Sequence, residues 1–280
     1  MADQHTEIFK NYVGGQWLSS NGENTYEITS PANKDSVLGS FQISGVDDVS
    51  QAVDAAHSAL ASWADTPAPA RAHILYKALE IMERRSEELA ETITIEEGKP
   101  ISDARGEVRR AMNIIEYAAG EGRRMFGYTT PSELPNTVAY TVKRPLGVVG
   151  IITPWNFPLA IPAWKIAPAL ICGNTIVFKP ASSTPMTAVK LVEIFEEAGI
   201  PEVVSPGYVG GESTTQLAQD AVAAPGPAKQ KVKEKLIDEK IKFKMLPEDD
   251  AECYINRAEI KAIHKVVDAK WKRWFYFYRR

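Results

Sequence analysis

Cysteine and histidine are scarce in this 280-residue chain, and their scarcity excludes several kinds of site. The two cysteines, Cys172 and Cys253, lie far apart in unlike surroundings, so no disulfide framework is expected and a reducing, cytoplasmic location is indicated. The histidines are scattered, without the cysteine–histidine cluster that a structural zinc site needs. No apolar run is long enough to cross a membrane, and the polar N-terminus has no secretory signal core.

The balance of charge changes sharply along the chain. Residues 228–280 contain 15 Lys and Arg and 9 Asp and Glu, whereas residues 1–227 contain 17 and 27. The overall net charge of −4 conceals this change. Proline and glycine at 221–227 are typical of a linker, so we expect residues 221–280 to be a linker plus a basic helical segment of unassigned origin.

A small β element and a layer of helices are predicted at the start of the chain. Residues 11–45 contain short strands and turns, and Gly14-Gly15 and Asn21-Gly22 are typical of hairpins. The apolar period then becomes helical. Four helices are expected, the first capped by Asp47 or Asp48, the second after Pro69, the third over 86–97 and the fourth over 103–120.

Two apolar strands alternate with two helices in the region after residue 145. Val148–Ile152 and Thr175–Phe178 are typical of buried parallel strands, and the helix after each ends at a glycine, Gly173 or Gly199. This order predicts an α/β fold with a doubly wound parallel sheet. Before it, the alternating residues 128–145 predict a β-ribbon arm. The expected cofactor-binding domain comprises residues 1–127 and 146–220.

Several motifs occur in a fixed order along this pattern. They are Glu96-Glu-Gly-Lys-Pro100, Arg144-Pro-Leu-Gly147, Thr153-Pro-Trp-Asn-Phe-Pro158 and Gly173-Asn-Thr-Ile-Val-Phe-Lys-Pro180. Over about residues 8–200 the chain resembles the N-terminal, cofactor-binding half of the aldehyde dehydrogenase superfamily, and within it the semialdehyde and ketoglutaric-semialdehyde dehydrogenases. The resemblance implies a Rossmann-like fold and oxidation of an aldehyde to a carboxylic acid with NAD or NADP.

The resemblance also implies roles for single residues. Asn156 would donate its side-chain amide to the oxyanion formed when a cysteine thiolate attacks the aldehyde, and losing such a donor typically costs about 3–4 kcal/mol of transition-state stabilisation. On spacing alone, Asn156 is also a good helix N-cap, and one residue could do both. Phe157 and Trp164 would line the substrate tunnel, with packing in the core as the alternative. Lys165 is either catalytic support or a snorkelling surface residue.

Cofactor contacts are expected around the ends of the two strands. Lys179 would bind the adenosine ribose, and its alternative is a solvated strand end. Ser182 stands where many NAD-preferring relatives have glutamate, so a 2′-phosphate would not be repelled and NADP is expected to be accepted. The remaining implied cofactor-binding residues are Thr153, Pro154, Trp155, Ala181, Gly210 and Gly211.

The family's nucleophilic cysteine and catalytic glutamate belong to motifs that this chain does not contain. Cys172, in an apolar run, predicts a buried structural thiol, and Cys253 lies among carboxylates that disfavour a thiolate. We therefore expect the catalytic domain to be largely absent and the chain to be inactive alone. The alternatives are a nucleotide-binding or subunit-pairing fragment, homo-oligomeric through 128–145, or nucleic-acid or membrane contact through the basic aromatic segment 257–280.

Overall fold

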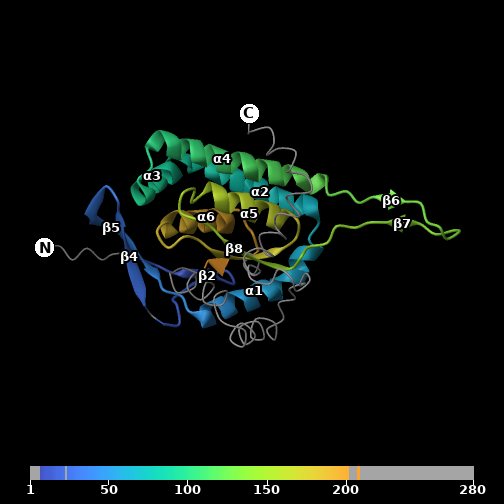
Figure 1. Cartoon of the computed structure of the whole chain (residues 1–280), viewed down its shortest axis with the longest axis horizontal. Helices are drawn as coiled ribbons and strands as arrows, with labels where there is room; N and C mark the ends of the chain where they lie inside the picture. The colour runs from blue at the N-terminus through green and yellow to red at the C-terminus, as the bar shows by residue number, and fades with distance from the viewer. Residues whose placement is uncertain (1–6, 23, 202–206, 209–280) are drawn as a thin grey trace, which may run out of the picture.

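A five-stranded sheet forms the centre of the computed structural model, which describes residues 7–22, 24–201 and 207–208 (Figure 1). The strand order is β3-β2-β10-β9-β8. The strands are β2 (Asn11–Val13), β3 (Gln16–Leu18), β8 (Val148–Ile152), β9 (Thr175–Lys179) and β10 (Gly207–Tyr208). Strands β8, β9 and β10 are parallel, and β2 joins β10 in the antiparallel sense. The predicted parallel sheet is thus confirmed, with an antiparallel hairpin added at one edge.

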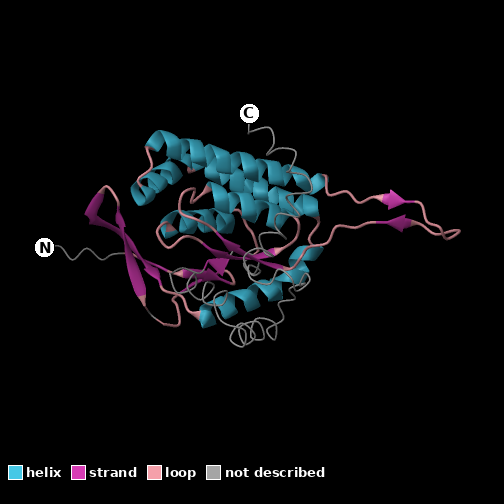
Figure 2. Cartoon of the chain, in the orientation of Figure 1, coloured by secondary structure: helices cyan, strands magenta, loops and turns pink. Residues whose placement is uncertain are grey.

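Helices cover both faces of this sheet in layers (Figures 1 and 2). Helix α1 (Val46–Asp65) packs on one face, and α5 (Ala160–Ile171) and α6 (Pro185–Glu197) lie on the other. An outer layer of α2 (Ala68–Arg84), α3 (Ser86–Glu97) and α4 (Ile101–Gly120) covers α5 and α6. The 3₁₀ turn η1 (Glu121–Arg123) follows α4. The doubly wound fold and its helical layer are confirmed, although α1 lies across the sheet from the other three N-terminal helices.

One hydrophobic core extends from the sheet through the α5/α6 layer to the outer helices. Phe178 of β9 and Phe195 of α6 are fully buried there, as are Ile151 of β8 and Ile176 of β9. Four of the five residues of β9 are buried, and in β8 the buried Val149 and Ile151 alternate with more accessible residues. Nearly continuous burial of β9 is the pattern of a strand covered by helices on both faces.

The N-terminal β element divides into two sheets. Gly14 and Gly15 have φ of 58° and 80°, which suits the tight β2–β3 hairpin that the sequence predicted. The hairpin predicted at Asn21-Gly22 is wrong, because β3 pairs with β2 alone and the next strand belongs to another sheet. That sheet has the order β1-β5-β4, from β1 (Ile8–Phe9), β5 (Asn33–Gln42) and β4 (Thr25–Ser30).

The N-terminus of α1 is capped differently from the prediction. The N-cap residue is Gly45, not Asp47 or Asp48. Asp48 lies in the first turn, where its carboxylate accepts hydrogen bonds from the N–H of Gly45 (2.7 Å) and of Asn21 (2.9 Å). A buried carboxylate therefore joins the turn after β3 to the start of the helix. Helix α4 begins at Ile101, two residues before the predicted start.

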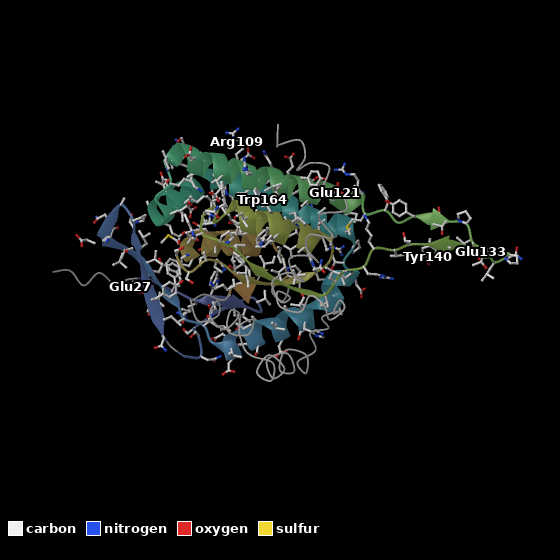
Figure 3. The ribbon with its side chains drawn as sticks, viewed as in Figure 1. Glu27, Arg109, Glu121, Glu133, Tyr140 and Trp164 are labelled. Atoms are coloured by element: carbon white, nitrogen blue, oxygen red, sulfur yellow. The ribbon has the colours of Figure 1, made fainter. Side chains whose placement is uncertain are left out.

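A two-stranded ribbon projects from the body of the molecule, as the alternating sequence predicted (Figure 3). It consists of β6 (Thr129–Thr130) and β7 (Ala139–Tyr140), paired antiparallel. Within the described ranges, no helix has the length and apolar character needed to cross a membrane. The predicted segment 221–280 lies outside the described residues.

Candidate functional site at the carboxyl edge of the sheet

The predicted site residues of the two strand ends lie side by side. Strands β8 and β9 run parallel, with Ile152 opposite Lys179, so both strands end at the same edge of the sheet. The N–H of Thr153 then donates to the carbonyl of Lys179 at 3.2 Å. The loop that starts at Thr153 and the turn that starts at Pro180 are therefore neighbours. Carboxyl edges of parallel sheets are where open α/β folds bind ligands.

Lys179 and Ser182 form the polar part of this edge. The Nζ atom of Lys179 lies 3.3 Å from the hydroxyl oxygen of Ser182. Lys179 is only 9% exposed, whereas Ala181 and Ser182 are half-buried. The solvated strand end considered for Lys179 is therefore wrong. An ammonium and a hydroxyl at one place can donate to and accept from a vicinal diol such as a ribose.

Asn156 lies at the same edge with an exposed side chain. Helix α5 begins at Ala160, with Leu159 as its N-cap, so the interpretation of Asn156 as a helix cap is wrong. Among the described residues, the side-chain amide of Asn156 has no hydrogen-bond partner, whereas its backbone carbonyl accepts from Lys99. The backbone is held and the amide is available to a ligand. Pro154 and Trp155 are exposed beside it.

A buried glutamate caps each helix that follows a parallel strand. Glu107 of α4 accepts hydrogen bonds on Oε1 from the N–H of Leu159 (2.9 Å) and of Ala160 (3.1 Å) at the start of α5. Glu96 of α3 accepts from the N–H of Met186 (2.5 Å) and of Thr187 (2.9 Å) at the start of α6. Both carboxylates come from the outer helical layer. The positive ends of α5 and α6 are thus already occupied by acidic groups of the chain itself.

The sequence contains a signal for Glu107 that no motif reveals. Glu107 falls on the face of α4 that carries Ala104, Val108 and Ala111, all buried. An acidic residue at a buried position requires partners, which here are the N–H groups of α5. Glu96 was noticed only as part of a motif that carries the resemblance. Its tertiary partners, more than 80 residues away, could not be read from the sequence.

Lys99 connects the motif after α3 to the loop that carries Asn156. Its Nζ atom lies 2.5 Å from Oε2 of Glu107 and 3.1 Å from Oε2 of Glu97. It also donates to the carbonyl of Asn156 at 3.0 Å. The ammonium stands 4.4 Å from the ring centroid of Phe157, within cation–π range. One cation therefore contacts two carboxylates and two consecutive residues of the loop.

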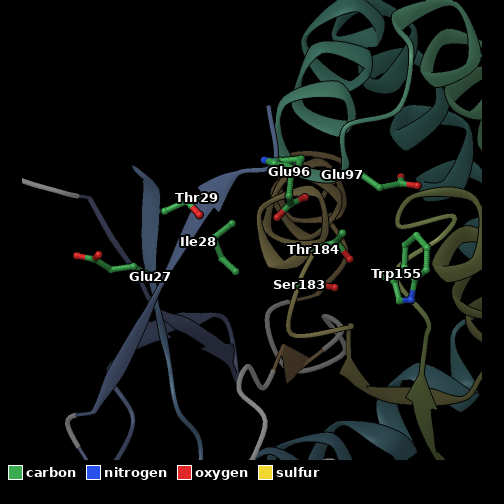
Figure 4. Close-up of a pocket in the computed structure, with 9 residues that line it drawn as sticks. Glu27, Ile28, Thr29, Glu96, Glu97, Trp155, Ser183 and Thr184 are labelled. Carbon is green, nitrogen blue, oxygen red and sulfur yellow. The ribbon is translucent and has the colours of Figure 1, made fainter. Parts of the chain in front are cut away.

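A pocket of about 330 Å³ opens next to this edge (Figure 4). Glu96, Glu97, Trp155 and Thr184 line it together with residues of β4. The hydroxyl of Thr184 is buried there without a hydrogen-bond partner in the described part of the chain. Among the predicted cofactor-binding residues, Trp155 faces this pocket. The part played by β4 was not predicted.

The remaining candidates pack around the loop. Phe157 and Trp164 are half-buried and pack against the core, and their role in a substrate tunnel stays a prediction. Lys165 donates to the carbonyl of Ile152 at 3.0 Å, and burial lowers its pKa. Cys172 is half-buried at the C-cap of α5, and burial raises the pKa of its thiol. Gly210, Gly211 and Cys253 lie outside the described residues.

Comparison with known proteins identifies the class of protein to which this edge belongs. The profile of the aldehyde dehydrogenase family matches residues 17–223. A 2,5-dioxopentanoate dehydrogenase of Saccharolobus solfataricus is 45% identical over 220 residues, which cover 77% of this chain and 46% of that protein. An alpha-ketoglutarate semialdehyde dehydrogenase of Haloferax volcanii is 42% identical over 227 residues, covering 79% of this chain and 47% of that protein.

Solved structures agree with these relatives. An NADP-dependent enzyme of E. coli superposes with a TM-score of 0.73 at 34% identity, over 85% of this chain and 50% of that chain. A 3,6-anhydro-L-galactose dehydrogenase in complex with NAP gives a TM-score of 0.71 at 38% identity, over 74% and 43%. The chain belongs to the aldehyde dehydrogenase family, as its motifs predicted. It spans about half the length of the curated relatives that it matches.

The cap formed by Glu96 predicts a pH-dependent stability. Burial raises the pKa of its carboxyl to about 7, against the opposing effect of hydrogen bonds from Thr187 and Met186. In the unfolded chain the carboxyl titrates near 4.5, so between about pH 4.5 and 7 the folded state binds the proton more tightly. The free energy of unfolding should therefore fall by about 3 kcal/mol as the pH rises through this window.

Denaturant unfolding at a series of pH values checks this expectation. Glu96→Gln removes the titrating group, so its stability profile should lack the decline seen in the wild type. Glu91→Gln is the matched control, because Glu91 is an exposed glutamate on the same helix. Parallel profiles for the wild type and Glu96→Gln between pH 4.5 and 7 would contradict the expected titration.

Proposed function

We propose that this chain binds NAD or NADP at the carboxyl edge of β8 and β9 and contributes Asn156 to the oxidation of an aldehyde to a carboxylic acid. The observation that carries the proposal is the meeting of three features at one edge. The Lys179 ammonium stands beside the Ser182 hydroxyl, and the exposed amide of Asn156 lies on the neighbouring loop. When bound, the cofactor supplies the hydride acceptor that aldehyde oxidation requires.

The chemistry of the edge fits a dinucleotide. Lys179 offers an ammonium at a buried strand end, where its contact with a ribose hydroxyl would be shielded from water. Ser182 offers a hydroxyl that can donate or accept. Asn156 offers N–H donors without negative charge, which suits an oxyanion. The same edge thus provides separate groups for the cofactor and for the reacting carbonyl oxygen.

We infer that this chain binds nucleotide without oxidising aldehydes alone. Burial raises the pKa of the Cys172 thiol, which disfavours the nucleophilic thiolate. Cys172 also lies at the C-terminal end of α5, whereas Asn156 precedes the N-terminus of the same helix. The favoured substrate class for the complete catalytic unit is a semialdehyde, which the names of the similar dehydrogenases support. A cytoplasmic location remains a prediction.

Lys179→Met tests the cofactor site. The substitution keeps the length of the side chain and removes the charged donor, so the affinity for NAD should fall about 10- to 100-fold, as expected for a hydrogen bond to a charged group. Isothermal titration calorimetry of the purified chain measures the change. Lys77→Met is the control, since Lys77 is exposed on α2. Equal affinities of both variants would exclude Lys179 as a ribose ligand.

Ser182→Glu tests the cofactor preference. A carboxylate at this position would repel a 2′-phosphate and could pair with the Lys179 ammonium, which is 3.3 Å from the present hydroxyl. We expect the affinity for NADP to fall at least tenfold more than the affinity for NAD. Ser183→Glu places the same charge one residue further, on an exposed side chain, and controls for the general effect of charge. A preference that is unchanged in Ser182→Glu would refute this role of Ser182.

The ribbon of residues 128–145 supports a second proposal, that copies of the chain associate through it. Tyr128, Val138 and Tyr140 are each more than two thirds exposed on an arm that leaves the body of the molecule (Figure 3). Exposed apolar side chains on a projecting ribbon are typical of a contact surface. Val138→Asp with Tyr140→Asp should shift the sedimentation coefficient to that of a smaller species, and Ser132→Asp should not. A wild-type chain that sediments as a monomer would refute the proposal.

A further inference from the structure

We propose that Lys99 is a positioning residue that holds the Asn156 loop in the orientation needed to present the Asn156 amide. This inference rests on the proposed function, in which the Asn156 amide must be held in place to bind the oxyanion. Lys99 itself points to the backbone of the loop and not to the exposed amide, so it acts through Asn156. The loop between β8 and α5 is exposed at Pro154, Trp155 and Asn156, so contacts with the rest of the chain are needed to hold its orientation.

The loop is attached at two points on either side of Phe157 and Pro158. At the first point, the Lys99 ammonium donates a hydrogen bond to the carbonyl oxygen of Asn156 at 3.0 Å. At the second, Oε1 of Glu107 accepts the N–H groups of Leu159 and Ala160. Between them, Pro158 has a fixed φ and is buried. The segment cannot turn about its own axis without breaking one of these attachments.

Lys99 controls both attachments because it also orients Glu107. The two oxygens of this fully buried carboxylate have different partners, and Oε2 lies 2.5 Å from the ammonium while Oε1 faces the helix. Without the cation, the carboxylate would be buried with one oxygen unpaired, which is a costly arrangement. The side chain of Lys99 is only 13% exposed, so water would replace the ammonium poorly.

The shape of the ammonium suits this place. The Lys99 ammonium donates hydrogen bonds to Oε2 of Glu107 and to the carbonyl oxygen of Asn156, and Oε2 of Glu97 lies 3.1 Å from the same nitrogen as an ion-pair partner. The Phe157 ring covers a further side at 4.4 Å from Nζ. A planar guanidinium could not meet the same three oxygens from one point. The position therefore requires a compact cation and not positive charge alone.

Exchange and NMR measurements on the whole chain test the proposal. In Lys99→Met, amide hydrogen exchange at Leu159 and Ala160 should become at least tenfold faster, while exchange at Ile176 and Val177 of β9 stays within twofold of the wild type. In protein labelled with ¹⁵N-asparagine, the side-chain NH₂ pair of Asn156, assigned through its loss in Asn156→Asp, should broaden or split. A role in overall stability alone would accelerate exchange in β9 as well.

Lys190→Met is the matched control. Lys190 also contacts two glutamates, Glu88 at 3.3 Å and Glu193 at 3.4 Å, but it lies on α6 and not beside the Asn156 loop. It should leave the Leu159 and Ala160 amides and the Asn156 signal unchanged. If Lys99→Met does not fold, Lys99→Arg provides the same comparison with the charge retained, and faster exchange limited to the loop is again expected.

The outcomes separate this inference from the proposed function. An unchanged loop in the Lys99 variant, or an equal change in Lys190→Met, would overturn the positioning role. NAD titrations of the same samples test the proposed function independently, since Lys179 and Ser182 lie on the neighbouring turn. Failure of the wild type to bind NAD would refute the cofactor site and leave the exchange result standing as evidence on the loop.

Discussion

Two carboxylates of the outer helical layer, Glu96 and Glu107, reach inward to the first N–H groups of α6 and α5. Burying a carboxylate is costly unless donors surround it, and the first turn of a helix offers N–H groups that have no partner within the helix. Each buried glutamate therefore stabilises both its own carboxylate and the helix that it contacts. The glutamate obtains donors, and the helix obtains a cap, so the outer layer and the inner helices are fixed in register with each other.

This arrangement determines how a cofactor can bind. In many dinucleotide-binding folds the pyrophosphate sits at the N-terminus of the helix after the first strand, where a glycine-rich turn gives it access. Here the corresponding N–H groups of Leu159 and Ala160 already hold Glu107. A phosphate at this place would have to displace a buried anion and would be repelled by it. The sequence contains no G-x-G-x-x-G pattern that would bring a pyrophosphate to this helix. The glutamate takes the place that the pyrophosphate would occupy.

In the proposed site, polar groups at the strand ends would bind the cofactor in place of a helix N-terminus. Lys179 is the last residue of β9 and is nearly buried. Its ammonium therefore lies at the edge of the sheet and is shielded from bulk solvent. The Thr153 N–H bond to its carbonyl holds the two strand ends together. Ligand contacts on this turn and on the Asn156 loop would therefore move as one unit.

The sequence allowed most of the fold to be predicted, for reasons that also explain the errors. The runs at 148–152 and 175–178 are short, apolar and followed by helices, so their parallel pairing was predictable. Periodicity identifies a face that must be buried but not the surface that buries it. For this reason the sequence could not show that α1 covers the opposite face of the sheet, or that β2 adds to β10.

The site was predictable where a motif implied it and not where tertiary contacts create it. Asn156 and Lys179 could be proposed as site residues because their neighbours in sequence form recognisable motifs. The motif of residues 96–100 shows what a motif alone cannot predict, because three of its residues contact three different parts of the fold. Glu96 faces α6, Lys99 faces the Asn156 loop, and Gly98 lies against Pro31 of the β4–β5 turn.

The middle position explains why the motif has its spacing. Gly98 ends α3 with φ of 83°, a left-handed conformation, and a Cβ atom there would lie 3.0 Å from a carbon of Pro31. The sharp turn at glycine is what allows Glu96, on the last turn of the helix, and Lys99, just beyond it, to point to different partners. A continued helix would carry residue 99 onto another face and away from Glu107. The capping of α6 and the support of the Asn156 loop therefore both depend on the turn that Gly98 makes.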